Sequence, residues 1–440
     1  MRKFFQYPVW LSCLLLAYMP FHIFLSQSVS LLTGGLEYWK IAKDLIVLVS
    51  TPIIILILKS KRLLNQKIIK TVLLIGSAYL LIHLTYFLLN STLDKQSTLL
   101  ATVYNLRPIA LLLIGIAGGY ALESPDKLNK LAKLTLSISS LVALLAIIQY
   151  FLPNDILENF VYSIARGVKP IFYIDDKPNL PRVMSTIRDP NSLGAYLIVP
   201  ITGLTVFIRK SKKVNYLWVF LLCLHLIALV LTFSRSAWVG LVLSVGCFLV
   251  IEYKNKVGHI NTKTIVFITA LVLIVTSTVF IAKNNYVVEN VILHSDESTI
   301  SNDPNELRAV FQKEAVLSIL EKPQGYGPGT AGLVAISNPK GGLLTENYFL
   351  QIGYEVGLIG LALFCWIYAI SLIDLKEIFS RQKNKLTTKF SLILFCSAVG
   401  YIPVALLNHL WSNEAVVGQW WVLTGIVIGV NLLLTKSEES

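Results

Sequence analysis

The sequence predicts an all-α polytopic membrane protein, and three observations predict it. The 440 residues are 55% hydrophobic and 14% charged, with a mean hydropathy of +0.67, whereas a soluble protein carries about a quarter charged residues. Apolar runs of about 20 residues recur, each long enough to cross about 30 Å of hydrocarbon as a helix. Arg2 and Lys3 precede the first run without a small-residue cleavage site after it, so we expect a span and not a cleaved signal.

We expect one membrane domain over residues 1–440 with about twelve spans. The basic residues support this number, because with both termini cytoplasmic more than half of the 38 lysines and arginines fall in short inner segments. The net charge of +13 then follows from topology and attraction to membrane lipid, and we expect no nucleic-acid partner. The five cysteines fall inside expected spans, so no disulfide, metal or cofactor is indicated. The expected spans lie near residues 8–32, 41–58, 68–90, 98–121, 131–152, 191–208, 215–232, 236–253, 264–282, 346–370, 388–408 and 415–434.

Two long segments, 153–190 and 283–345, and two short corners, 232–235 and 408–411, are expected outside the cytoplasm. These outer segments carry cations, against the usual bias toward inner lysines and arginines. Lys169, Lys177 and Lys283 are expected to be solvated loop charges. The other outer cations are Arg166, Arg182, Arg188, Arg235, Arg308 and Lys313.

Arg235 occupies a connection too short to be a free loop, so its guanidinium is expected near membrane depth. Arg182 and Arg188 directly precede the sixth span. Several guanidiniums at one interface suit an anionic ligand, because the planar fork binds phosphate oxygens in pairs. Arg107, near the middle of the fourth span, is open to three interpretations: snorkelling to the interface, pairing with an acid such as Asp44, or lining a polar cavity.

The longer outer segment is expected to contain a helix. Asp303 and Pro304 have the character of a helix cap and a first helical residue, followed by an acidic first turn. The helix is expected to continue through Leu320, to end before Pro323, and to pack on the membrane surface or on other helices. The glycines of Gly325–Gly329 then favour a tight bend.

Four segments, taken in order, resemble one family. They are Pro181 to Gly194 with its arginines and Pro-Asn pair, the Thr-Phe-Ser-Arg corner at 232–235, Arg308 with the Pro-Gln-Gly-Tyr-Gly-Pro-Gly run at 323–329, and Glu-Asn-Tyr-Phe-Leu-Gln at 346–351 followed by Glu355. Over residues 180–365 the chain resembles the O-antigen ligase and O-antigen polymerase (Wzy-type) superfamily of bacterial membrane glycosyltransferases.

The resemblance implies a metal-independent, GT-C-like inverting enzyme on the outer face of the cytoplasmic (inner) membrane. Its donor would be a glycan on undecaprenyl pyrophosphate, and its acceptor another glycan, a lipid A core or a protein. The arginines would hold the pyrophosphate, whose developing negative charge requires preorganised cations. The residues expected in this role are Arg182, Arg188, Arg235 and Arg308.

One position departs from the family pattern. Ligases commonly have histidine before the asparagine, as the candidate base for the acceptor hydroxyl, and here that residue is Glu346. We expect Glu346 to act as the base, with Arg235 as its catalytic partner, and the change favours a polymerase over a strict lipid A ligase. The alternative is that Glu346 caps the helix or pairs with an arginine. Supporting roles are expected for Asn347, Gln351, Glu355 (a buried polar partner, of an arginine for instance) and His409.

Two other functions fit a chain with these spans. A transporter or flippase of lipid-linked oligosaccharide is compatible with twelve spans, but it usually shows paired halves, and we find no correspondence between spans one to six and seven to twelve. A cell-wall polymerase of the shape, elongation and division type would use a similar donor, but its motifs are absent from the sequence.

Overall fold

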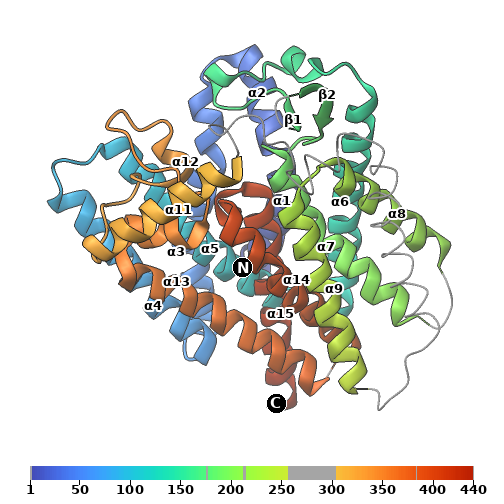
Figure 1. Cartoon of the computed structure of the whole chain (residues 1–440). Coiled ribbons are helices and arrows are strands. Elements are labelled where there is room, and N and C mark those ends of the chain that lie inside the picture. The colour runs from blue at the N-terminus through green and yellow to red at the C-terminus, as the bar shows by residue number, and fades with distance from the viewer. Residues whose placement is uncertain (1, 175–176, 212–214, 256–303, 383, 440) are drawn as a thin grey trace.

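A computed structural model describes the chain except for residues 1, 175–176, 212–214, 256–303, 383 and 440. The described part is almost entirely helical (Figure 1). Its α-helices are α1 (Arg2–Tyr18), α2 (His22–Thr33), α3 (Leu36–Ser60), α4 (Lys67–Leu89), α5 (Lys95–Tyr120), α6 (Leu128–Phe151), α7 (Pro190–Arg209), α8 (Tyr216–Leu231), α9 (Arg235–Asn255), α11 (Pro304–Glu321), α12 (Gly332–Ala335), α13 (Tyr348–Arg381), α14 (Lys385–Leu407) and α15 (Glu414–Glu439).

The all-α membrane fold is confirmed. Within the described residues, 10 helical segments are long and apolar enough to cross a membrane, α1 and α2 together forming the first. Helix α8, at 16 residues, is apolar but shorter. The span expected at 264–282 lies outside the described residues, so the total of about twelve stays a prediction. The orientation of the termini also stays a prediction.

Helices α5 and α15 form the centre of the bundle. Gly115 and Gly119 on α5 face Gly425 and Gly429 on α15, and a Cβ atom added at Gly119 would lie 2.1 Å from the Ile426 carbonyl oxygen. Small residues allow such close backbone approach, which is how helices associate in lipid without a hydrophobic driving force. This contact fixes the position of α15, whose first turn lies next to the candidate site.

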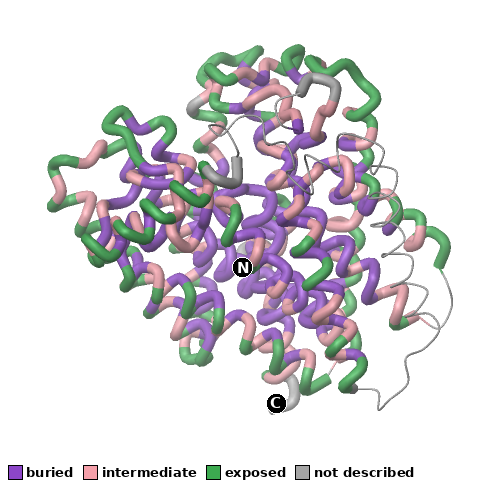
Figure 2. Tube along the Cα trace, in the orientation of Figure 1, coloured by how far each residue is buried: buried purple, intermediate pink, exposed green. Residues whose placement is uncertain are grey.

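The outer helices expose apolar side chains. Leu74, Leu81 and Leu88 on α4 are 69%, 65% and 72% exposed, and their spacing of seven places them on one helix face. In Figure 2 exposed residues lie around the outside of the bundle, with buried residues in its centre. Such a surface suits contact with lipid.

Two features of the outer segments emerge from the structure. The segment 153–190 contains an antiparallel hairpin of β1 (Phe172–Ile174) and β2 (Lys177–Arg182), which the sequence analysis did not predict. The helix expected after Pro304 is confirmed as α11, and it ends at Glu321; its expected cap, Asp303, lies outside the described residues. The hairpin lies at one end of the bundle, here called the hairpin end, and the C-terminus lies at the other (Figure 1).

Candidate functional site: a cationic cavity at the hairpin end

A cavity of about 330 Å³ opens at the hairpin end, which is within the usual range of about 300–1,000 Å³ for ligand pockets. Four parts of the chain build it: the hairpin segment, the start of α7, the segment from α12 to Glu346, and the corner between α14 and α15. Its polar lining consists of Lys169, Arg182, Arg188, Asp189, Asn191, Ser192, Glu346, Asn408 and His409.

Arg182 and Arg188 both line this cavity, as expected, but they differ in their partners. Arg182 donates from Nε to the Thr232 carbonyl oxygen (2.9 Å) and from Nη2 to Asn191 Oδ1 (2.8 Å), which ties the hairpin to the corner before α9. Arg188 is half-buried and makes no hydrogen bond or ion pair to any described residue. Its guanidinium is therefore open to an anion entering the cavity.

Arg308 and Glu346 form an ion pair at the cavity wall. Arg308 Nε donates to Glu346 Oε2 at 2.6 Å, and Gln312, one turn further along α11, donates to the Leu406 carbonyl oxygen at 3.1 Å. The alternative of arginine pairing for Glu346 is thus the observed one. The cap of α13 is Asn347 instead, whose Oδ1 accepts from two backbone amides of the first turn. Asn347 therefore caps α13, and its supporting role in the site stays a prediction.

Arg235 begins α9 and is half-buried. It lies outside the set of residues that line the cavity. Its neighbour Ser236 accepts a hydrogen bond from Asn408 Nδ2 at 3.0 Å, so the two short corners expected on the outer face do lie together. The catalytic and pyrophosphate-binding roles of Arg235 stay predictions.

His409 lies in the corner between α14 and α15 and is half-buried. Its Nδ1 lies 2.9 Å from Gln351 Oε1 on α13, while Nε2 has no hydrogen-bond partner among the described residues. Burial, and then the positive charges of Arg188 and Arg308, together lower the pKa of His409 to about 4. Its ring is therefore neutral at physiological pH.

Glu355 lies away from the cavity, and its partners are not arginines, which corrects that part of the expectation. Its carboxylate accepts from Asn105 Nδ2 at 2.8 Å and from the Gly329 amide at 2.9 Å. Asn105 belongs to α5, so Glu355 joins three parts of the chain that are far apart in sequence. Its supporting role is to anchor the glycine-rich turn.

The turn at Gly325–Gly329 packs against a break in α13. Gly357 has φ of 73°, which interrupts the helix, and the turn supplies replacement hydrogen bonds. The amide of Gly327 donates to the Glu355 carbonyl oxygen at 2.8 Å, and the Leu358 amide donates to the Pro323 carbonyl oxygen at 2.9 Å. Backbone hydrogen bonds thus join the glycine-rich turn to the helix break at Gly357. This contact places the segment that leads to Glu346.

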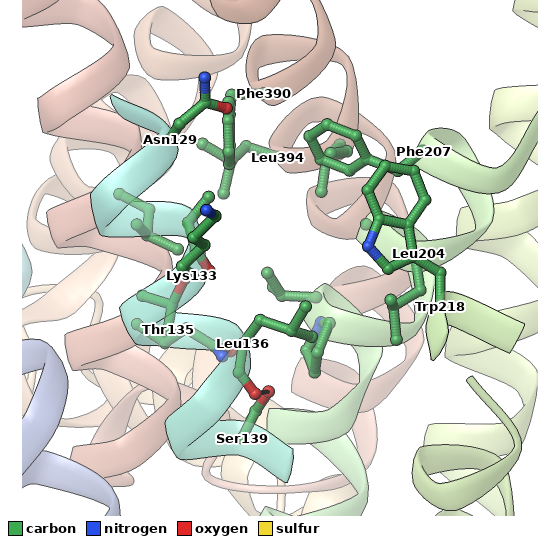
Figure 3. Close-up of a pocket in the computed structure, with 17 residues that line it drawn as sticks. Asn129, Lys133, Thr135, Leu136, Ser139, Leu204, Phe207, Trp218, Phe390 and Leu394 are labelled. Carbon is green, nitrogen blue, oxygen red and sulfur yellow. Dashed lines mark hydrogen bonds between the residues drawn. The ribbon is translucent and has the colours of Figure 1, made fainter. Parts of the chain in front are cut away.

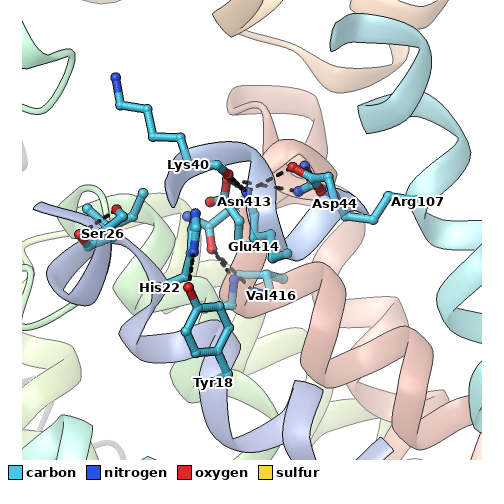
Figure 4. Close-up of polar contacts among 12 residues, drawn as sticks. Tyr18, His22, Ser26, Lys40, Asp44, Arg107, Asn413, Glu414 and Val416 are labelled. Carbon is cyan, nitrogen blue, oxygen red and sulfur yellow. Dashed lines mark hydrogen bonds and ion pairs between the residues drawn. The ribbon is translucent and has the colours of Figure 1, made fainter. Parts of the chain in front are cut away.

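A second cluster of charges is buried next to the site, and the sequence analysis anticipated only part of it. Arg107 Nη2 lies 3.0 Å from Asp44 Oδ1, which confirms that pairing. Lys43 Nζ lies 3.0 Å from Asp44 Oδ2 and 3.5 Å from Glu414 Oε1. Figure 4 shows Asp44 beside Arg107, and the His22 ring hydrogen-bonded to Tyr18. Charged residues inside apolar runs are the signal that would have found Lys43 and Glu414.

This buried charge quartet (Lys43, Asp44, Arg107 and Glu414) contains two cations and two anions, each at most 5% exposed. Because Glu414 is the first residue of α15, the quartet fixes the helix that directly follows the His409 corner. It acts as a support for the site.

A smaller cavity of about 170 Å³ lies at the other ends of α7 and α14. In Figure 3, side chains of α6 such as Leu136 and Ser139 face Phe207 and Trp218 across it. Its lining is mostly apolar, with Lys133 as the one charged residue among those described. Nothing in it suits an anion as the hairpin-end cavity does.

The helical membrane fold and the arginine-lined cavity at one end of it define a polytopic membrane protein with a ligand-sized polar cavity. Residues 192–365 match the family model described as O-antigen ligase, so this part of the chain is similar to that family. The match includes Arg235, Arg308 and Glu346, begins after Arg188 and ends before His409.

Among curated proteins, the chain is similar to the ComP-specific O-oligosaccharyltransferase of Acinetobacter baylyi. The two sequences are 26% identical over 269 residues, which is 57% of this chain and 45% of that relative. The match therefore spans less than half of the relative's length.

Proposed function

We propose that this protein transfers a glycan from a polyprenyl diphosphate carrier to an acceptor on the outer face of the cytoplasmic membrane. The observation that carries the proposal is Arg188, which lines a ligand-sized cavity and makes no hydrogen bond or salt bridge to a described residue. A charge left without a partner in a half-buried site costs free energy unless a ligand compensates it. A diphosphate supplies the opposite charge in the geometry that guanidinium binds best.

The chemistry requires cations at this place. When the acceptor oxygen attacks the anomeric carbon, the bond from that carbon to the diphosphate oxygen breaks and the diphosphate leaves with the electron pair. Preorganised guanidiniums stabilise the charge that develops on the leaving oxygen. Arg188 is the first of these guanidiniums, and Arg182 lines the same cavity with two of its donors already committed to the chain.

We propose that Arg308 also binds the diphosphate, by exchanging its present anionic partner for the ligand. Its ion pair with Glu346 holds Arg308 at the cavity wall. A diphosphate that enters the cavity competes with the Glu346 carboxylate for this guanidinium. In this scheme Glu346 holds Arg308 in position between turnovers. Its expected role as the base for the acceptor hydroxyl requires the carboxylate to be released from Arg308.

The acceptor classes are another lipid-linked glycan, a lipid A core or a protein. The matched relative is by name an O-oligosaccharyltransferase specific for ComP. We therefore propose that a protein hydroxyl be tested as an acceptor in addition to the sugar hydroxyls.

The test is transfer by the purified protein from a synthetic undecaprenyl diphosphate oligosaccharide to each acceptor class in turn. Arg188→Ala should weaken apparent donor affinity about 10- to 100-fold, the loss expected for a charge-assisted hydrogen bond, and Arg188→Lys should retain part of it. Arg308→Ala and Arg235→Ala should abolish transfer without loss of membrane insertion. Arg381→Ala is the matched control, because Arg381 is exposed and pairs with Glu377 on α13, away from the cavity.

If the wild-type protein forms no product with any of the three acceptors, the proposed transfer activity is refuted. Movement of the labelled lipid across vesicles without transfer would instead support the transporter alternative. Unchanged donor affinity in Arg188→Ala would remove the diphosphate role of this arginine.

A further inference from the structure

His409 has an acceptor atom that the fold leaves unused. Gln351 Oε1 can only accept a hydrogen bond, so His409 Nδ1, at 2.9 Å, carries the ring proton. In the neutral ring Nε2 then holds a lone pair. This atom is buried and meets no partner among the described residues, although His409 lines the cavity.

Buried polar atoms are almost always paired with protein or water. Because other atoms of His409 line the ligand cavity, its unpaired nitrogen, buried behind the cavity wall, indicates that the missing partner is the ligand. The lone pair can accept only from a donor, and neither the diphosphate nor its anionic oxygens supply one. A hydroxyl group does.

We propose that His409 is a catalytic residue, whose Nε2 takes the proton from the acceptor hydroxyl, and that Gln351 positions it. The proposal rests on the function proposed above. As the proton moves from the hydroxyl to Nε2, the acceptor oxygen bonds to the anomeric carbon, and the diphosphate departs with the electron pair of the broken bond. Deprotonation of the imidazolium by solvent restores the base.

His409 is better placed for this role than Glu346. The Glu346 carboxylate is engaged by Arg308 at 2.6 Å, and its side chain is 32% exposed, whereas His409 Nε2 is buried and has no other partner to leave. The family's histidine is absent from position 346, and the corner between α14 and α15 brings another imidazole to the same cavity from a different part of the chain. Glu346 then keeps the role of holding Arg308.

The surrounding charges couple this base to donor binding. Arg188 and Arg308 lower the pKa of His409, and the cavity also contains Arg182, Asp189 and Glu346 in its lining or at its wall. A bound diphosphate offsets the effect of the guanidiniums and raises that pKa toward its ordinary value. The ring therefore becomes a stronger base only when a donor is in place.

The experiment compares His409→Asn with wild type in single-turnover transfer at saturating donor. The asparagine amide can still donate toward Gln351 but lacks the acceptor at Nε2. We expect the transfer rate to fall about 10²- to 10⁴-fold with donor affinity within about twofold of wild type. The wild-type rate should fall as pH is lowered, because a protonated ring accepts no proton, and His409→Asn should lose this limb. His225→Gln, which alters a buried histidine of α8 outside the cavity, should transfer at the wild-type rate.

A second variant keeps the proposal testable if asparagine disturbs the corner: in His409→Ala, added imidazole should restore part of the rate. Transfer by His409→Asn at the wild-type rate, or a loss confined to donor affinity, would overturn the assignment. Glu346→Gln should change donor affinity more than the transfer rate; the reverse result would return the base to Glu346. If wild type itself transfers nothing while Arg188→Ala still loses donor binding, the proposed function fails, and the role of His409 fails with it.

Discussion

Gly325 lies where the glycine-rich turn touches the break in α13, and a methyl group there should force the two apart. A Cβ atom at this position would lie 2.6 Å from the Gly357 amide nitrogen and 2.7 Å from the Glu355 carbonyl oxygen. Both are backbone atoms, so no flexible side chain can move away. The left-handed backbone (φ +95°) adds about 1–2 kcal/mol for a residue with a side chain, and overpacking adds about 1–3 kcal/mol.

We therefore expect Gly325→Ala to lose about 2–5 kcal/mol of unfolding free energy. The matched control is Gly341→Ala, because Gly341 also has positive φ (+76°) but has nothing within 4 Å of its Cβ position. It should lose only the backbone contribution, partly offset by about 0.4–1 kcal/mol from reduced freedom in the unfolded chain.

The assay is denaturant titration of both variants in mild-detergent micelles, followed by glycan transfer at a temperature where both remain folded. Because the turn leads to the Glu346 segment, Gly325→Ala should also lose transfer activity that Gly341→Ala retains. Equal unfolding free energies for the two variants, within about 0.5 kcal/mol, would refute the claim that close approach to α13 requires glycine at position 325.

Three further predictions concern buried polar groups. Arg107→Leu should cost about 3–5 kcal/mol of unfolding free energy by leaving carboxylates uncompensated, and adding Asp44→Leu should recover most of it in the same titration, because the remaining two charges of the quartet balance. The pKa of His409 is about 4 in the folded protein and 6.5 ordinarily, so the unfolded chain binds the proton first, and stability should fall by up to about 3 kcal/mol as pH drops from 6.5 to 4; His409→Asn should remove this component from the pH titration. Glu355→Gln should cost about 1–3 kcal/mol by turning an amide donor toward Asn105 Nδ2, and adding Asn105→Asp should restore stability by supplying an acceptor.

Much of the fold follows from the sequence because lipid imposes simple requirements. A run of about 20 apolar residues has few alternatives to a spanning helix, and the helix α11 ends near Pro323 because proline cannot continue it. The hairpin was missed for an equally physical reason. Strand β2 contains Pro178 and Pro181, and prolines argue against a strand unless it lies at a sheet edge. In a two-stranded hairpin each strand has a free edge.

The sequence predicts which residues line the cavity but not which residues they contact. Arg182, Arg188 and Glu346 were singled out from ordered motifs, and they do line one cavity. Which arginine is engaged and which is open depends on partners far away in the chain, such as the Thr232 carbonyl for Arg182. No local spacing encodes such a partner. For the same reason the sequence suggests an arginine as one partner for Glu355, whereas the structure shows Asn105.

Charge balance sorts the polar residues at membrane depth into two kinds. In the quartet of Lys43, Asp44, Arg107 and Glu414 each charge lies within about 4 Å of an opposite one, so its formal charges balance without a ligand. At the cavity, Arg188 makes no hydrogen bond or salt bridge to a described residue, and His409 Nε2 has no donor among the described residues. One deficit calls for an anion and the other for a hydroxyl, which are the leaving group and the nucleophile of a glycosyl transfer.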